Sequence, residues 1–298
     1  MAKAKIDFHI HPHFNSYNAE SIVEAMYARG IDIVGLAGYN RDIFDDIRKE
    51  FDKLQNPFKV TNDSLAIKVT NEDDKERYIL NVGEYENKGG FHLLVFGNQK
   101  GIKQKEGLGK NIEAALSTDS FAVIDHPFVA LNYSDISKEN EDFLFGLCKD
   151  YNSKIALEWN GYSIPLLKKG IDKLFCSTLR LIGENIRFSD TNKKLENFSG
   201  ILKQNKINCP VIADTDLHAR SKNDLDLIGT ANIEIDIADF EKESGKALQK
   251  SLKEKIFNLE YEVNKGYVPR SHFLFSYAIP VGISQMHKEI ERRILPRG

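Results

Sequence analysis

The chain has 298 residues, 41% of them hydrophobic and 29% charged, and carries a formal net charge of −3 at pH 7. This balance is typical of a globular protein and excludes the disordered and membrane-embedded classes. Because the chain has no overall basic charge, we expect it not to bind long nucleic acid through its general electrostatic field. No stretch is apolar over the length of a membrane span or a secretory signal, so we expect no membrane association and a cytoplasmic location.

The cysteine pattern agrees with that location. The three cysteines, Cys148, Cys176 and Cys209, are odd in number, widely spaced and never arranged as C-x-x-C. This pattern argues against both a disulfide framework and a zinc ribbon, and it predicts reduced structural thiols.

Strands and helices alternate in the first part of the chain. Residues 3–11 alternate between polar and apolar side chains as a strand does, and residues 19–30 carry apolar side chains at helical spacing up to a glycine. Residues 31–38 are typical of a buried strand, and residues 41–54 of a second amphipathic helix. A β–α–β–α order of this kind predicts parallel strands.

The middle of the chain interrupts this alternation and then returns to it. Strand-like runs over residues 58–70, 76–86 and 91–97 are separated by turn-rich stretches, which predicts a hairpin inserted into the sheet. The later elements are expected in this order: helix 111–117, strand 121–127, helix 139–151, strands 154–160, 210–218 and 228–237, and a surface helix region within 239–263.

No internal repeat or Pro/Gly/Ser-rich linker divides the chain. We therefore expect one barrel domain over residues 1–265 and a tail over residues 266–298 that packs against it. The aromatic residues Phe273, Phe275 and Tyr277 of this tail could instead form the contact of an oligomer.

Histidines and acids gather at the ends of the predicted strands. His9 and His11 lie two residues apart at the end of one strand, so both imidazoles point to the same side. Any one of these residues could be an ordinary polar residue, but five of the eight histidines and two acids share this placement. The further members are Glu84, His92, His126, Asp216 and His218. Imidazole with carboxylate suits zinc, manganese or iron, so the pattern predicts a metal site at one rim of a parallel barrel.

In this order the motifs resemble those of the polymerase-and-histidinol-phosphatase (PHP) family over roughly residues 5–220. The resemblance implies an α/β fold, a distorted TIM-like (β/α)7 barrel of the PHP type with metals at the C-terminal ends of its strands. The matching runs are Asp7-Phe8-His9-Ile10-His11, Gly83-Glu84, His92 to Gly97, His126-Pro127 and Asp216-Leu217-His218.

The resemblance also implies which residues hold the metals. In the family, the opening histidines, the glutamate and the closing aspartate bind the first metal, and they correspond to His9, His11, Glu84 and Asp216. A second metal shares Glu84 and takes the two middle histidines, which correspond to His92 and His126. A single carboxylate that bridges two cations also offsets their mutual repulsion.

Two of the three ligands that trinuclear members use for a third metal are missing. Leu36-Ala37-Gly38-Tyr39-Asn40 stands where a histidine-containing run is expected, and residues 15–18 lack the early aspartate. The resemblance therefore implies two divalent metal ions (Zn, Mn or Fe), unless His13 or Asn40 serves as a replacement ligand. His218 then remains to bind a phosphate oxygen or to donate a proton.

Two divalent cations about 3.5–4 Å apart can convert a water molecule to hydroxide and hold the oxygens of a phosphoester. We therefore expect a metal-dependent phosphoesterase that hydrolyses a small phosphorylated metabolite or short nucleotide, with Asp216 and His218 in catalysis. The side chains expected to bind substrate phosphate are Arg41, Arg220, Lys88 and Asn160. Two alternatives stay open: a degenerate PHP-like domain that keeps metal for structure or partner binding without hydrolysis, and a metal-dependent amidohydrolase.

Overall fold

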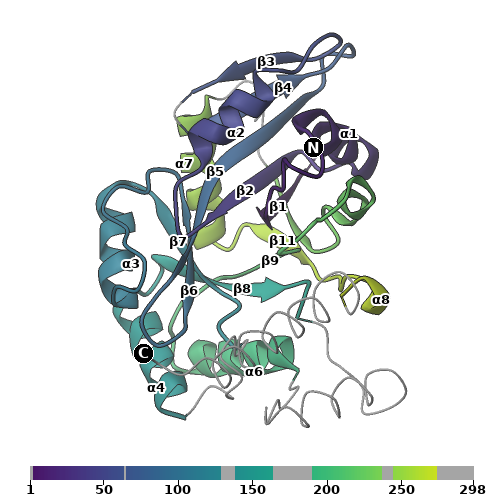
Figure 1. Cartoon of the computed structure of the whole chain (residues 1–298). Helices are drawn as coiled ribbons and strands as arrows, with labels where there is room; N and C mark the ends of the chain where they lie inside the picture. Colours follow the sequence, from purple (N-terminus) through teal and green to yellow (C-terminus); the bar gives the residue numbers. More distant parts are fainter. Residues whose placement is uncertain (1–2, 64, 129–137, 164–189, 237–243, 274–298) are drawn as a thin grey trace, which may run out of the picture.

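The computed structural model describes residues 3–63, 65–128, 138–163, 190–236 and 244–273. The strands form one curved sheet with helices packed around it (Figure 1). The strands are β1 Ala4–Ile10, β2 Ile33–Tyr39, β3 Lys59–Asn62, β4 Ala66–Thr70, β5 Glu76–Glu86, β6 His92–Phe96, β7 Phe121–Asp125, β8 Ile155–Asn160, β9 Val211–Asp214, β10 Asn232–Ile235 and β11 Tyr261–Asn264. The helices are α1 Ala19–Arg29, α2 Phe44–Phe51, α3 Leu108–Ser117, α4 Lys138–Asp150, α6 Thr191–Gln204, the 3-10 helix η1 Lys222–Leu227, α7 Gly245–Phe257 and α8 Arg270–His272.

The sheet is mixed rather than wholly parallel. Its strands follow the order β11-β10-β1-β2-β5-β6-β7-β8-β9. The pairs β1–β2, β2–β5, β7–β8 and β8–β9 are parallel, which confirms the parallel strands that the sequence predicts. β6 runs antiparallel to both of its neighbours, and β10 and β11 add an antiparallel edge beside β1.

The two ends of this strand order come together and nearly close a barrel. Leu217, which follows β9, forms a parallel bridge with Ile10 at the end of β1. The amide of Leu217 donates to the carbonyl of His9 over 3.0 Å, and the amide of His11 donates to the carbonyl of Leu217 over 2.9 Å. The fold is therefore mixed α/β with a barrel-like sheet, in agreement with the expected distorted TIM-like barrel.

The predicted hairpin is confirmed and explains the length of β5. β3 pairs antiparallel with β4, and β4 pairs antiparallel with the first half of β5, from Glu76 to Leu80. The second half of β5, from Val82 to Glu86, pairs with β6 instead. One 11-residue strand thus joins the hairpin to the barrel, and its end carries Glu84.

Local sequence explains how the first two strands are positioned. The side chain of Asn18 accepts a hydrogen bond from the amide of Ser21 at the start of α1, and Gly30 ends the helix with a φ of 64°. Gly35 lets β2 approach β1 closely, because a Cβ at this position would lie 2.1 Å from the carbonyl oxygen of Phe8.

The barrel interior is apolar at one end. Phe8, Phe96 and Phe121 lie in one buried cluster, and the rings of Phe96 and Phe121 stack at 4.2 Å. Helix α7 completes this cluster with side chains such as Leu248 and Leu252, which are fully buried. The predicted helix is therefore present, but the expectation of a surface helix is incomplete, because one face of α7 closes the apolar end of the barrel.

Two other buried clusters lie between the sheet and its helices. α1 and α2 pack with outward residues of β1 and β2, and α3, α4 and α6 pack with outward residues of β6 to β8. Sequence reasoning identified neither α6 nor β11. Cys148 and Cys209 are buried free thiols, as expected, while Cys176 lies outside the described residues.

The first part of the predicted tail contacts the barrel. The amide of Val268 donates to the carbonyl of Gly161 over 3.1 Å, and the rings of Tyr267 and Trp159 lie 4.9 Å apart. Phe273 packs against the core, whereas Phe275 and Tyr277 lie outside the described residues. Across the described ranges, no helix combines the length and apolar character needed to cross a bilayer.

Candidate metal centre

Inward-facing columns of side chains change from apolar to polar at one rim of the barrel. On β5 the inward positions run through Leu80 and Val82 to Glu84, because alternate residues of a strand share a face. The same progression leads through Val123 to Asp125 on β7. β6 runs in the opposite direction, so its first residue, His92, lies at this rim and pairs with Asp125.

A β-bulge directs the opening histidines inward. Phe8 belongs to the barrel interior, whereas Ile10 belongs to the cluster under α1, although regular alternation would place both on one face. The register between β1 and β2 shifts between Asp7 and Ile10. This irregularity accounts for the inward direction of His9, a common use of bulges beside functional sites.

The first group of proposed ligands surrounds the Nε2 atoms of His9 and His11, which lie 3.0 Å apart. Glu84 Oε2 lies 3.2 Å from His11 Nε2 and 3.9 Å from His9 Nε2. Asp216 Oδ1 lies 3.5 Å from each of the two nitrogens. The structure thus brings together all four residues that the resemblance to the PHP family would assign to a first metal.

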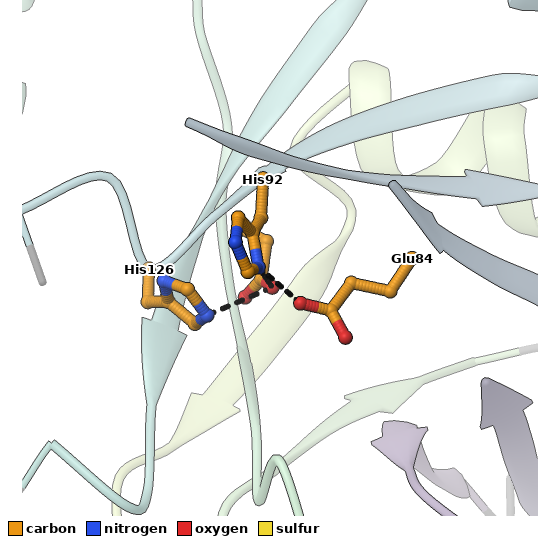
Figure 2. A group of neighbouring side chains, drawn as sticks. Glu84, His92 and His126 are labelled. Carbon is orange, nitrogen blue, oxygen red and sulfur yellow. Dashed lines mark hydrogen bonds and ion pairs between the residues drawn. The ribbon is translucent and has the colours of Figure 1, made fainter. Parts of the chain in front are cut away.

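The second group lies on the other side of the Glu84 carboxylate. Glu84 Oε1 is in close contact with His92 Nδ1, and Figure 2 shows Glu84 directed toward His92. The rings of His92 and His126 lie 5.0 Å apart. Asp125, which the sequence analysis did not name, joins them with Oδ2 3.0 Å from His126 Nε2. Each of these four residues offers one ligand atom within 4.8 Å of the others.

His218 lies at the edge of the first group. Its ring stacks on that of His11 at 4.3 Å, and its Nε2 lies 3.2 Å from Asp216 Oδ1. Its side chain is 27% exposed, compared with 9% for His11 and 10% for Asp216. His218 is therefore close enough to join a metal group with these two residues and also accessible to a substrate.

Two of the proposed ligands have unusual backbone conformations. His126 has a φ of 26° and Asp216 a φ of 52°, a region that non-glycine residues rarely adopt. Such conformations cost on the order of 1–3 kcal/mol each and occur most often at functional sites.

Three buried carboxylates, one of them Asp125 of the second group, surround Nδ1 of His9. Glu158 Oε1 lies 2.8 Å from His9 Nδ1, and Asp125 and Asp214 each place an oxygen within 4.0 Å of the same nitrogen. Burial and the neighbouring Glu158 raise the pKa values of Asp125 and Asp214 well above their usual range. Burial also acts to raise the pKa of Glu158, but the neighbouring Asp125, His9 and Asp214 together outweigh it and lower that pKa.

The pKa values of His9 and His126 are shifted in opposite directions. Burial disfavours protonation of His9, yet Asp216 and Asp125 raise its pKa well above the usual value. Burial lowers the pKa of His126, and His92 adds to the effect. Without cations, the site therefore holds positive charge on His9.

The donor atoms fit divalent cations. Within the described structure, several buried carboxylate oxygens of this cluster accept no hydrogen bond: both oxygens of Asp125, both of Asp214, and Oδ1 of Asp216. Unsatisfied buried oxygens are uncommon and costly in native proteins. Cations bound by the oxygens of Asp125 and Asp216 and by the nearby imidazoles would remove that cost at these two residues, and the donor set is the one that zinc, manganese and iron accept.

Of the four residues expected to bind phosphate, three are exposed and one is buried. Arg41, Lys88 and Arg220 are exposed on segments that follow β2, β5 and β9. Asn160 is buried instead: its amide nitrogen donates to Glu158 and Asp216, and its oxygen accepts from two backbone amides. The hydrogen bonds of Asn160 are therefore made within the protein, which argues against phosphate binding by this residue.

Neither of the two possible replacement ligands for a third metal, Asn40 and His13, lies in one of the metal groups of the described residues. Asn40 accepts a hydrogen bond from the amide of Glu86 over 2.8 Å, so its side-chain oxygen is engaged at the strand end. His13 is exposed and belongs to none of the metal groups found among the described residues. Tyr39, half exposed, places its ring 5.7 Å from that of His92 where the family pattern has its histidine-containing run.

Comparisons with known proteins give distant likenesses only. No family model and no curated protein sequence matches the chain. The lesion-specific endonuclease Q of Pyrococcus furiosus has a TM-score of 0.48 at 16% identity, over 88% of this chain and 58% of that one. Endonuclease Q in complex with a 27-mer duplex that carries an abasic lesion gives 0.45 at 15% identity, over 85% and 57%.

A proposed metal-dependent phosphoesterase from Bifidobacterium adolescentis has a TM-score of 0.37 at 11% identity, over 72% of this chain and 88% of that one. The chain thus spans less than two thirds of the endonuclease Q chains.

Proposed function

We propose that this chain is a metal-dependent phosphoesterase with a two-cation site. The first cation is held by His9, His11, Glu84 and Asp216, and the second by Glu84, His92 and His126. The observation that carries the proposal is the position of Glu84, whose two carboxylate oxygens face the two groups separately.

The structure suggests one addition to the expected ligands. Asp125 lies at the end of β7, fully buried, and its carboxylate has no hydrogen bond within the described structure although two histidines lie near it. We therefore add Asp125 to the residues that hold the second cation. The native metal, whether zinc, manganese or iron, follows from the donor set only as a class.

When bound, two such cations lower the pKa of a coordinated water and neutralise the charge of a phosphoryl group. The residues of the chain then orient the substrate and exclude water. His218 is the most exposed of the seven residues and is adjacent to Asp216, so we assign it to contact a phosphate oxygen or to supply a proton to the leaving group. Arg41, Arg220 and Lys88 supply exposed cations on the same rim, and we propose that they bind substrate phosphate.

The proposed substrate is a small phosphorylated metabolite or short nucleotide. The net charge of −3 supports this choice over long nucleic acid. Endonuclease Q was captured with a 27-mer duplex containing an abasic lesion, so an oligonucleotide of that kind belongs in the substrate panel. Cleavage of the duplex in preference to every small phosphoester would replace the proposed substrate class.

The test is hydrolysis of p-nitrophenyl phosphate by the full chain with added manganese or zinc. We expect turnover that requires the metal and is lost in His126→Ala. Asn111→Ala is the control, since Asn111 is equally buried and hydrogen-bonded but lies on α3, outside the metal groups. Bound metal without hydrolysis of any phosphoester would support a non-catalytic domain, and turnover confined to amides or carboxylic esters would support an amidohydrolase.

A further inference from the structure

Glu158 on β8 contacts both groups of proposed ligands from beneath. The side chain is fully buried and reaches neither solvent nor the rim. Its Oε1 lies 2.8 Å from Nδ1 of His9, which belongs to the first group. Its Oε2 accepts a hydrogen bond over 2.8 Å from the backbone amide of His126, which belongs to the second. One carboxylate thus joins strands β1 and β7 through two of the proposed ligands.

Asn160, two residues farther along the same strand, extends this network to a third proposed ligand. Its Nδ2 donates to Glu158 Oε2 over 3.1 Å and to Asp216 Oδ2 over 2.7 Å. The opposite side of the amide is held as well, because its Oδ1 accepts from the amides of Tyr162 and Ser163 over 2.7 and 3.0 Å. Asn160 is therefore fixed in one orientation.

These contacts decide which atoms remain available to cations. A carboxylate at Nδ1 of His9 keeps the N–H on that nitrogen, so Nε2, which lies toward His11 and Glu84, is the nitrogen that gives up its proton when a cation binds. On Asp216, Oδ2 is engaged by Asn160, whereas Oδ1 is buried without a hydrogen bond in the described structure. In both ligands the atom engaged by Glu158 or Asn160 is the one turned away from the metal groups, and the other atom faces them.

The contact with His126 acts on the backbone. The φ of 26° at this residue is sterically unfavourable, so this backbone conformation needs a stabilising interaction. The amide of His126 points into Glu158 rather than into a sheet ladder, and this hydrogen bond is charge-assisted and buried. The ring of His126 is thereby turned toward His92, as Figure 2 shows.

We infer that Glu158 and Asn160 are positioning residues that set the affinity of both proposed cation sites, without binding a cation themselves. The inference rests on the proposed function, since it assumes cations at the two groups. It differs from a role in general stability in one respect: loss of Glu158 must weaken metal binding beyond any loss of fold.

The test is cation affinity of the full chain, measured with zinc and with manganese by competition against an indicator. In Glu158→Gln, one oxygen remains for the three donors that now meet the carboxylate, namely His9 Nδ1, the amide of His126 and Asn160 Nδ2, and the new NH2 group faces at least one of them, which is left unpaired. We expect the affinity at both sites to fall about 10–100-fold, the range seen when partners of metal-binding histidines are removed. Circular dichroism establishes that the variant is folded.

Asp63→Asn is the matched control. The Asp63 carboxylate also accepts from backbone amides on both oxygens, those of Leu65 and Ala66 on Oδ1 and that of Gly245 on Oδ2, and it contacts no proposed ligand. The same chemical change there should lower stability and leave cation affinity unchanged. Equal loss of affinity in both variants would overturn the inference, because it would mean that destabilisation alone weakens binding.

Asn160→Ala provides a second variant in case Glu158→Gln does not fold. It removes the hydrogen bond to Asp216 and leaves Glu158 in place, so we expect weaker binding at the first cation site with little change at the second. Wild-type affinity at both sites in either folded variant would overturn the inference. Wild-type protein that binds no cation would instead overturn the proposed function, and with it the inference.

Discussion

Replacement of Glu84 by glutamine should distinguish a site in which two cations share Glu84 from two independent groups of side chains. The change preserves the shape of the side chain but removes one negative charge between the two groups. The charge lies 3.9 Å from His9 Nε2 and closer to His11 and His92. A unit charge pair at about 4 Å contributes roughly 4 kcal/mol at an effective dielectric constant of about 20. Since about 1.4 kcal/mol corresponds to a factor of ten, we expect affinity to fall roughly 10²–10³-fold at both sites.

The assay is metal content after dialysis, together with the affinity for zinc by competition titration. Glu76→Gln is the control, because it makes the same change at the other end of β5, where Glu76 pairs with Lys68. At about 3.3 Å per residue, this position is about 26 Å from Glu84. If Glu84→Gln binds the same number of cations with the same affinity, or loses affinity at one site only, then Glu84 is not shared by two cations.

Three further predictions concern the fold and the protonation of the site. Gly35→Ala should abolish soluble folded protein, because the added Cβ would meet the Phe8 carbonyl oxygen at 2.1 Å, and circular dichroism with native β content would contradict this. Leu252→Ala leaves a cavity beside the buried face of α7. It should lower the free energy of unfolding by about 2–5 kcal/mol in urea titrations without changing metal content. Zinc binding at pH 7 should release protons, because burial lowers the pKa of His9 but Asp216 and the other carboxylates around it together outweigh burial and raise that pKa, and a cation must displace the proton. Affinity should therefore rise with pH, and calorimetry in buffers of different ionisation enthalpy gives the proton count; a count of zero would contradict the raised pKa.

That the proposed ligands lie close together could be predicted, because strand ends gather at one rim. His9, His11, Glu84 and Asp216 each stand at or just beyond the end of a strand that the sequence marks clearly. Parallel strands bring such ends together whatever the details of packing. The structure places all four within hydrogen-bonding or ion-pairing distance of at least one other member.

The acids beneath the rim were predicted less well. None of Glu158, Asp125 and Asp214 was among the predicted site residues, although each lies on the inward face of its strand in sequence alternation with a buried apolar residue. They could have been found by listing alternate residues of each strand from the apolar end of the barrel to the rim. Their contact with His9 depends on the barrel closing, since they come from three strands that pair only through long-range contacts.

The sequence by itself determined the alternation of strands and helices, the inserted hairpin and the residue types suited to metal. These features depend on local periodicity, on turn residues and on the chemistry of side chains, all of which one strand or helix carries alone. Only the tertiary structure decided the reversed direction of β6, the bulge that turns His9 inward and the use of α7 to close the apolar end of the barrel. Each of these depends on register and closure, which are set by which distant surfaces pack together.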